Sequence, residues 1–175
     1  MPMDQPLEEE PSGSAYFPVS CTKLVVMSIC TVGLYQIYWA WMCWECIRER
    51  DGRRLNPFWR SVYVSAIFFN FLLFWDVFRS TGDSKSRALG RSVLLGLVYA
   101  AFWFSSLVDE GAWPFLSILS FVALIPVQLR INAFNEREHP GHNPNRKYSR
   151  TNILAIVVSG LLIALAVVGW FFQPV

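Results

Sequence analysis

Cys43 and Cys46 have the spacing that comes closest to a chemical site in this sequence. Their C-x-x-C pattern is that of redox and zinc sites, but no second cysteine pair completes a tetrahedral set and no βαβ pattern accompanies them. On a helix the two thiols share one face, and a disulfide at a cytoplasmic boundary would meet a reducing compartment. The pair therefore predicts neither redox nor metal chemistry.

His139 and His142 could form a metal-binding pair only if their segment were helical. Pro140, Gly141 and Pro144 oppose a helix there, so we expect a solvated loop. The chain also contains no Gly-rich phosphate loop, no H-E-x-x-H motif and no G-x-S-x-G motif. We therefore predict that the protein is not an enzyme, and we assign no catalytic, metal-binding or cofactor-binding residue.

Aromatic residues recur every three positions just before a run of arginines. Such rings suit a place that is apolar at one end and wet at the other, so the pattern predicts an aromatic belt at a lipid headgroup boundary. A binding groove for a lipid or a partner helix is the alternative. The candidate residues for lipid or partner binding are Tyr35, Tyr38, Trp41, Trp44, Arg48, Arg53 and Arg54.

Polar side chains inside the apolar runs are the second set of candidates. Gln36, Asn70, Asp76 and Gln128 could line a path for a solute. Gln128 also shares a helix face with Asn132 and Asn135, and such amides can instead hydrogen-bond to a neighbouring helix. Arg79 is placed to pair with Asp76 three residues earlier on a helix.

The elements that must position these residues are apolar helices. The chain has 175 residues, of which 54% are hydrophobic and 16% aromatic, and its mean hydropathy of +0.34 is that of a polytopic membrane protein. We predict an all-α fold in which residues 1–20 form a disordered acidic tail and 21–175 form one transmembrane domain. The apolar runs are Leu24–Ile47, Trp59–Phe78, Ala88–Val108, Pro114–Phe134 and Ile153–Phe172.

Helix-start signals support several of these boundaries. Asn56 and Pro57 suit an N-cap and a first helical position. Asp83 and Ser84 are cap candidates for the third helix, and Ser149, Thr151 and Asn152 for the last. Pro126 predicts a kink within the fourth helix. Thr31 and Gly33 predict a small surface on which another helix can approach closely.

The positions of Lys and Arg bear on how many helices cross the membrane. The first, second and fourth connections are rich in Lys and Arg, whereas the third connection and the C-terminal residues have none. If the second helix enters and leaves on one face and the N-terminus is outside, all three basic connections are cytoplasmic. We therefore predict four spanning helices and a re-entrant or interfacial second helix. Five spanning helices remain the alternative, because residues 59–78 are long enough to cross.

One short motif resembles a known group of proteins. Residues 31–39, Thr-Val-Gly-Leu-Tyr-Gln-Ile-Tyr-Trp, resemble the T-x-G-x-Y-x-x-Y-W signature of bacterial inner-membrane proteins that share a domain of unknown function. Further likeness lies in residues 16–17, 57–60 and 126–128, so the resemblance extends over about residues 16 to 152. It implies a small helical, multi-pass protein of the bacterial inner membrane, and it implies no activity, substrate or cofactor.

Two classes of function follow from these patterns. The first is a non-enzymatic membrane component whose basic cytoplasmic face contacts anionic lipid or a protein partner. The second is a small transporter or channel, which would be oligomeric because four or five helices enclose little space. We expect membrane lipids as partners, a second copy or another membrane protein as a further partner, and no nucleic acid.

Overall fold

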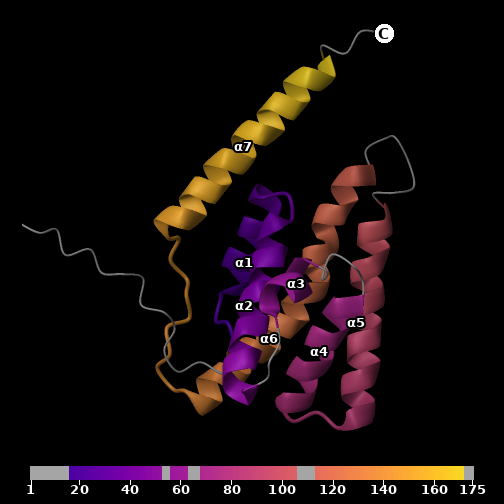
Figure 1. Ribbon diagram of the computed structural model, residues 1–175, viewed down its shortest axis with the longest axis vertical. Coiled ribbons are helices and arrows are strands. Elements are labelled where there is room, and N and C mark those ends of the chain that lie inside the picture. The colour runs from indigo at the N-terminus through magenta and orange to yellow at the C-terminus, as the bar shows by residue number, and fades with distance from the viewer. Residues whose placement is uncertain (1–15, 53–55, 63–67, 106–112, 172–175) are drawn as a thin grey trace, which may run out of the picture.

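The computed structural model describes residues 16–52, 56–62, 68–105 and 113–171, and the regular structure within them is entirely helical. The elements are α1 (Cys21–Cys30), α2 (Leu34–Asp51), α3 (Pro57–Val62), α4 (Phe68–Ser80), α5 (Lys85–Ser105), the 3₁₀ helix η2 (Trp113–Ser120), α6 (Phe121–Glu138) and α7 (Arg150–Phe171). Helices α1 to α6 form one bundle, and α7 projects away from it (Figure 1). The prediction of an all-α protein is confirmed.

The first predicted helix, Leu24–Ile47, is wrong as a single element. The chain turns after α1, where the φ angles of Val32 and Gly33 are 52° and 85°. The Thr31 hydroxyl donates to the carbonyl of Met27 at 2.7 Å and accepts from the amide of Tyr35 at 2.9 Å, which fixes both sides of the turn. The Thr-x-Gly pattern therefore separates two helices, and its role as a helix-packing surface stays a prediction.

The chain doubles back at this turn, so the segment before α1 lies alongside α2. The ring of Phe17 packs edge-on against Tyr38, with 5.9 Å between centroids, and the Arg50 guanidinium lies over the Tyr16 ring at 4.8 Å. Tyr16, Phe17 and Val19 are buried in the core, although the sequence prediction placed them in the tail. Residues 16–19 are called the strap below. The expected N-terminus opposite the basic connections is wrong for this part of the chain.

The second predicted helix, Trp59–Phe78, is two helices. The N-cap and first helical position are confirmed, because the amide of Trp59 donates to Asn56 Oδ1 at 3.4 Å and Pro57 opens α3. Residues 63–67 lie outside the described residues, and α4 follows. Arg50, at the end of α2, contacts Asp76, near the end of α4, at 3.1 Å. The chain thus leaves α2 and finishes α4 at the same end of the bundle (Figure 1).

Helices α5 and α6 run along the other side of the bundle. The start of α5 is fixed by Ser84, whose carbonyl accepts from the amide of Ala88 at 2.9 Å; the predicted end at Val108 lies outside the described residues. The predicted α-helix from Pro114 is wrong over its first part, because the chain is a 3₁₀ helix up to Ser120. Helix α6 follows and continues to Glu138, with Pro126 inside it. By length and composition, Lys85–Ser105 and Ser117–Glu138 could each cross a membrane.

Helix α7 has little contact with the rest of the molecule. Of its three candidate caps Ser149 is the one confirmed, since Ser149 Oγ accepts from the amide of Asn152 at 3.2 Å. Ala155 and Ile156 pack near α1, whereas the leucines further along are exposed, Leu165 by 67%. Exposed apolar side chains gathered in this way mark a surface that contacts a partner or a membrane.

Candidate functional site

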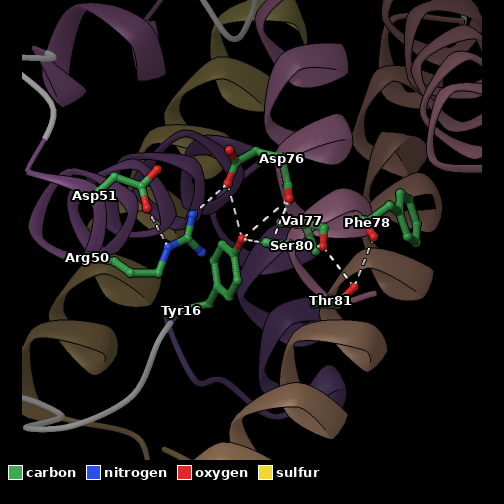
Figure 2. A network of polar contacts seen from close by, with 8 residues as sticks. All are labelled: Tyr16, Arg50, Asp51, Asp76, Val77, Phe78, Ser80 and Thr81. Carbon is green, nitrogen blue, oxygen red and sulfur yellow. Dashed lines mark hydrogen bonds and ion pairs between the residues drawn. The ribbon is translucent and has the colours of Figure 1, made fainter. Parts of the chain in front are cut away.

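A polar cluster joins the strap to the ends of α2 and α4 (Figure 2). Tyr16 Oη donates to Asp76 Oδ2 at 3.1 Å and also contacts the hydroxyl of Ser80. Arg50 donates from Nη2 to Asp76 Oδ2 at 3.1 Å and from Nε to Asp51 Oδ1 at 2.8 Å. A carboxylate between a phenol and a guanidinium has donors on two sides, so this cluster fastens three segments that are far apart in the sequence.

The electrostatics of Tyr16 define what the cluster can do chemically. Burial raises the pKa of the Tyr16 hydroxyl above its usual value of 10.0, and the negative charge of Asp76 raises it further. At neutral pH the phenol is therefore protonated and acts as a hydrogen-bond donor. This arrangement suits a structural role, in which the hydrogen bonds of Tyr16 hold α2, α4 and the strap together.

An open pocket of about 550 Å³ adjoins this cluster between α2 and α4. The indoles of Trp44 and Trp75 line it together with Arg79. Asp76 also lines it, near the end of α4 and among charged side chains. Its place on a solute path stays a prediction. Its ion-pair partner on α2, Arg50, is a residue that the sequence analysis did not propose.

A second charged cluster joins α5 to α6. Asp83 Oδ2 pairs with Arg91 Nη1 at 2.8 Å, and Asp83 Oδ1 pairs with Arg130 Nη2 at 3.1 Å. Arg130 also donates from Nε to Thr81 Oγ1 at 2.9 Å and from Nη2 to the Thr81 carbonyl at 3.0 Å. The Asp83 side chain is nearly fully buried, whereas that of Arg91 is half exposed.

Sequence analysis missed the binding potential of this second cluster. Asp83 was a candidate helix cap only, and Arg91 and Arg130 were not proposed as site residues. A signal was present, because Arg91 lies six residues after the start of α5 and Arg130 eight residues before the end of α6. Those positions are about 9 and 12 Å along their helices, so they match in depth when the two helices are antiparallel neighbours.

Gln128 ties α6 to α2 and to the strap. Its Oε1 accepts from the indole Nε1 of Trp39 at 2.5 Å. Its Nε2 donates to Asn132 Oδ1 at 2.8 Å and to the carbonyl of Phe17 at 3.4 Å. Both Gln128 and Trp39 are fully buried, so these bonds replace those that water would otherwise make.

The other two amides on this face of α6 hold the strap as well. Asn132 Nδ2 donates to the carbonyl of Val19 at 2.9 Å. Asn135 Nδ2 donates to the carbonyl of Tyr16 at 2.8 Å, and Asn135 Oδ1 accepts from the Tyr16 amide at 3.3 Å. A buried extended segment needs partners for its backbone groups, and three side-chain amides supply them here. The shared face predicted for these residues is confirmed, with a structural role.

The remaining polar candidates bond within clusters of their own. Gln36 Oε1 accepts from Ser120 Oγ at 2.9 Å, and Gln36 Nε2 donates to the carbonyl of Ile118 at 3.3 Å. Asn70 is buried and interacts with the side chain of Tyr99. Tyr99 also interacts with the side chain of Ser120, so Gln36 and Asn70 are joined through Tyr99 and Ser120, whereas Gln128 bonds to Trp39 and Asp76 to Arg50.

The predicted aromatic belt is divided between the core and the surface. Tyr35 and Trp44 are buried, whereas Tyr38 and Trp41 are each 40% exposed. The ring of Tyr38 lies 5.6 Å from that of Tyr35 and 6.2 Å from that of Trp41. Arg48 forms an ion pair with Glu45. Of this candidate set, Tyr38 and Trp41 are the rings open to a lipid or a partner, and Arg53 and Arg54 lie outside the described residues.

Cysteine and histidine side chains form no site in the part of the chain that the structure describes. The four cysteines are free, with Cys43 buried and Cys46 partly buried. No three of the described His, Cys, Asp and Glu residues are grouped so that they could hold a metal ion. His142 lies on a loop with its Nδ1 3.6 Å from Glu136 Oε2.

Comparisons of the chain with protein-family models, with curated proteins and with solved structures give no match. The likeness to the inner-membrane group with the T-x-G motif therefore stays a prediction from residues 31–39 and the shorter segments that accompany them.

Proposed function

We propose that the protein is a multi-pass integral protein of the bacterial inner membrane. The lengths of α5 and of residues 117–138 support this proposal, since about 20 helical residues cross about 30 Å of hydrocarbon. Exposed leucines along α5, α6 and α7 support it further, because a water-exposed surface of this kind would promote aggregation. In this proposal α5, α6 and α7 cross the bilayer.

The sorting of basic residues is the single observation that carries the orientation. Every Lys and Arg of α2, α4, α5 and α6 lies toward one end of the bundle, which we call the arginine-rich end. It comprises Arg48, Arg50, Arg79, Lys85, Arg87, Arg91, Arg130 and Arg137. Because Lys and Arg are enriched on the cytoplasmic side of short loops whatever the acidic residues nearby, we place this end in the cytoplasm.

The proposed path of the chain follows from the contacts at that end. The strap and α1 lead away from the arginine-rich end, and α2 leads back to it. The α3–α4 pair starts and finishes there, which supports the prediction that the second apolar run is re-entrant. Because Tyr16 lies next to Arg50, the described start of the chain is on the cytoplasmic side in this proposal, together with the three basic connections.

We further propose a non-enzymatic role, in which the arginine-rich end contacts anionic phospholipid headgroups. The polar side chains between helices support it, because they hold helices to one another: Gln128 bonds to Trp39, and Asp76 to Arg50. Ion pairs offset several of the arginines, whereas Arg79, Lys85 and Arg87 are exposed. Each basic residue near an anionic leaflet contributes about 1 kcal/mol of attraction.

Lipid-dependent unfolding of the purified protein tests this role. A ligand that binds only the folded state raises its unfolding midpoint, so phosphatidylglycerol added to detergent micelles should raise the midpoint more than phosphatidylcholine does. The variant R79Q/K85Q/R87Q should lose most of that difference. The matched variant R79K/R87K keeps the charge and should retain it. Equal stabilisation by the two lipids in the unaltered protein would contradict the proposed role.

A further inference from the structure

A groove lies between α5 and α6, with α4 at its foot. Its walls are largely apolar and include Leu94, Pro126, Leu129 and Ala133, and it encloses about 400 Å³. This volume is within the range of small-ligand sites, about 300–1,000 Å³. Leu94 is 62% exposed and Leu129 56% exposed, so the groove opens on the outer surface of the bundle. In the proposed membrane orientation that surface faces lipid acyl chains.

Two arginines line the same groove near the arginine-rich end. Arg91 and Arg130 approach it from α5 and α6, and the Arg91 guanidinium also lies over the Phe78 ring at 5.7 Å. Their shared partner Asp83 fixes both guanidinium groups in place. A pocket that is apolar along its length and cationic at one end is complementary to a phospholipid, which has an apolar tail and an anionic head.

The arginines retain donors for a further anion. Arg91 uses Nη1 for Asp83, and Arg130 uses Nε and Nη2 for Thr81 and Asp83. Among the residues that the structure describes, Nε and Nη2 of Arg91 and Nη1 of Arg130 bond to no acceptor. Two guanidinium groups on one carboxylate leave a net charge of +1. Planar guanidinium groups bind phosphate oxygens in pairs, which suits a phosphodiester at this place.

We propose that this groove is a binding site for one anionic phospholipid, with an acyl chain along Leu94 and Leu129 and the phosphate at Arg91 and Arg130. The proposal rests on the membrane location proposed above, and it names a particular site within it. Arg87 lies four residues before Arg91 on the same helix face and is exposed. A headgroup without an ammonium is favoured beside this third cation, so we expect phosphatidylglycerol to bind more tightly than phosphatidylcholine.

Native mass spectrometry of the detergent-purified protein, titrated with phosphatidylglycerol, tests the site. We expect one lipid to bind each copy with higher affinity than the rest, and millimolar inorganic phosphate should not displace it. The variant R91Q should weaken that first binding step about tenfold or more, because a charge-assisted hydrogen bond contributes about 1.5–3 kcal/mol. The variant A133F should do the same by filling the groove while keeping every charge.

The matched control is R146Q. Arg146 is exposed in the segment between α6 and α7 and does not line the groove, so its loss should leave the first binding step unchanged. Equal weakening by R146Q and R91Q, with no effect of A133F, would overturn the groove site and leave general attraction of anionic lipid in place. No preference for phosphatidylglycerol in any variant would overturn both proposals. A dimer without bound lipid would show that a second copy covers the groove. If R91Q fails to fold, A133F and R146Q still test the site.

Discussion

The bond between Trp39 and Gln128 gives the most direct prediction about what holds the fold together. Both side chains are fully buried, and Gln128 also bonds to Asn132 and to the carbonyl of Phe17. In the variant Q128L the indole N–H of Trp39 stays buried and loses its acceptor. Leaving such a donor unsatisfied costs about 1–3 kcal/mol, so we expect Q128L to lower the free energy of unfolding by that amount.

A double-mutant cycle separates this bond from other effects of the substitution. W39F removes the donor and also reduces the packing volume, so it destabilises the protein by itself. In W39F/Q128L neither partner is left alone, so the double variant should be more stable than the sum of the two single effects predicts. Coupling energies of side-chain hydrogen bonds in membrane proteins average about 0.6 kcal/mol and reach about 1.7. With full burial and a 2.5 Å contact we expect a value in the upper half of that range.

Reversible unfolding by sodium dodecyl sulfate in mixed micelles measures these free energies. The control is L129M, one residue further along α6 on the exposed surface, which should change the free energy by less than about 0.5 kcal/mol. Additive effects of W39F and Q128L would refute the claim that the two side chains are bonded. A Q128L variant as stable as the unaltered protein would refute the claim that this amide is structural.

The backbone turn and the Tyr16 cluster give three further predictions for the same unfolding assay. Because Gly33 has a φ of 85°, G33A should destabilise by about 1 kcal/mol, whereas G160A in α7 should not, since a Cβ added at Gly160 would meet no other atom. Val32 has a φ of 52°, a conformation that branched side chains resist and asparagine tolerates, so V32N should stabilise by up to about 1 kcal/mol. Burial, and then the charge of Asp76, raises the pKa of Tyr16, so the stability that Tyr16 contributes is complete below pH 10 and is lost as the pH rises above 10. The variant Y16F should flatten this alkaline decline in stability, and an unchanged decline would contradict the role given to the Tyr16 hydroxyl.

Local signals predicted the parts of the fold that depend on neighbouring residues. Asn56 and Pro57 identified the start of α3, and the cap candidates Ser149, Thr151 and Asn152 identified the start of α7 to within a few residues, because a cap is a property of three or four adjacent residues. The division between α1 and α2 was missed because hydrophobicity does not report backbone angles. A glycine two residues after Thr31, within an apolar run longer than one span needs, was the available signal.

The candidate sites were harder to predict because they depend on which helices are neighbours. Arg50 and Asp76 are 26 residues apart, and Gln128 and Phe17 are 111 residues apart, and no spacing rule links such positions. The aromatic ribbon illustrates the same limit, since Tyr38 and Trp41 are exposed whereas Trp44 is buried against other helices. Periodicity predicts that residues share a face, and only the packed bundle determines what that face contacts.

Side-specific cysteine labelling tests the central claim, which is that the end of α2 and the junction between α4 and α5 lie on the cytoplasmic side. In a background without the four native cysteines, E49C and S84C place exposed thiols at these positions, and S105C places one at the far end of α5. A membrane-impermeant maleimide should label E49C and S84C only from the cytoplasmic side of membrane vesicles, and S105C only from the other side. Labelling of E49C and S84C from opposite sides would contradict the proposed path of the chain.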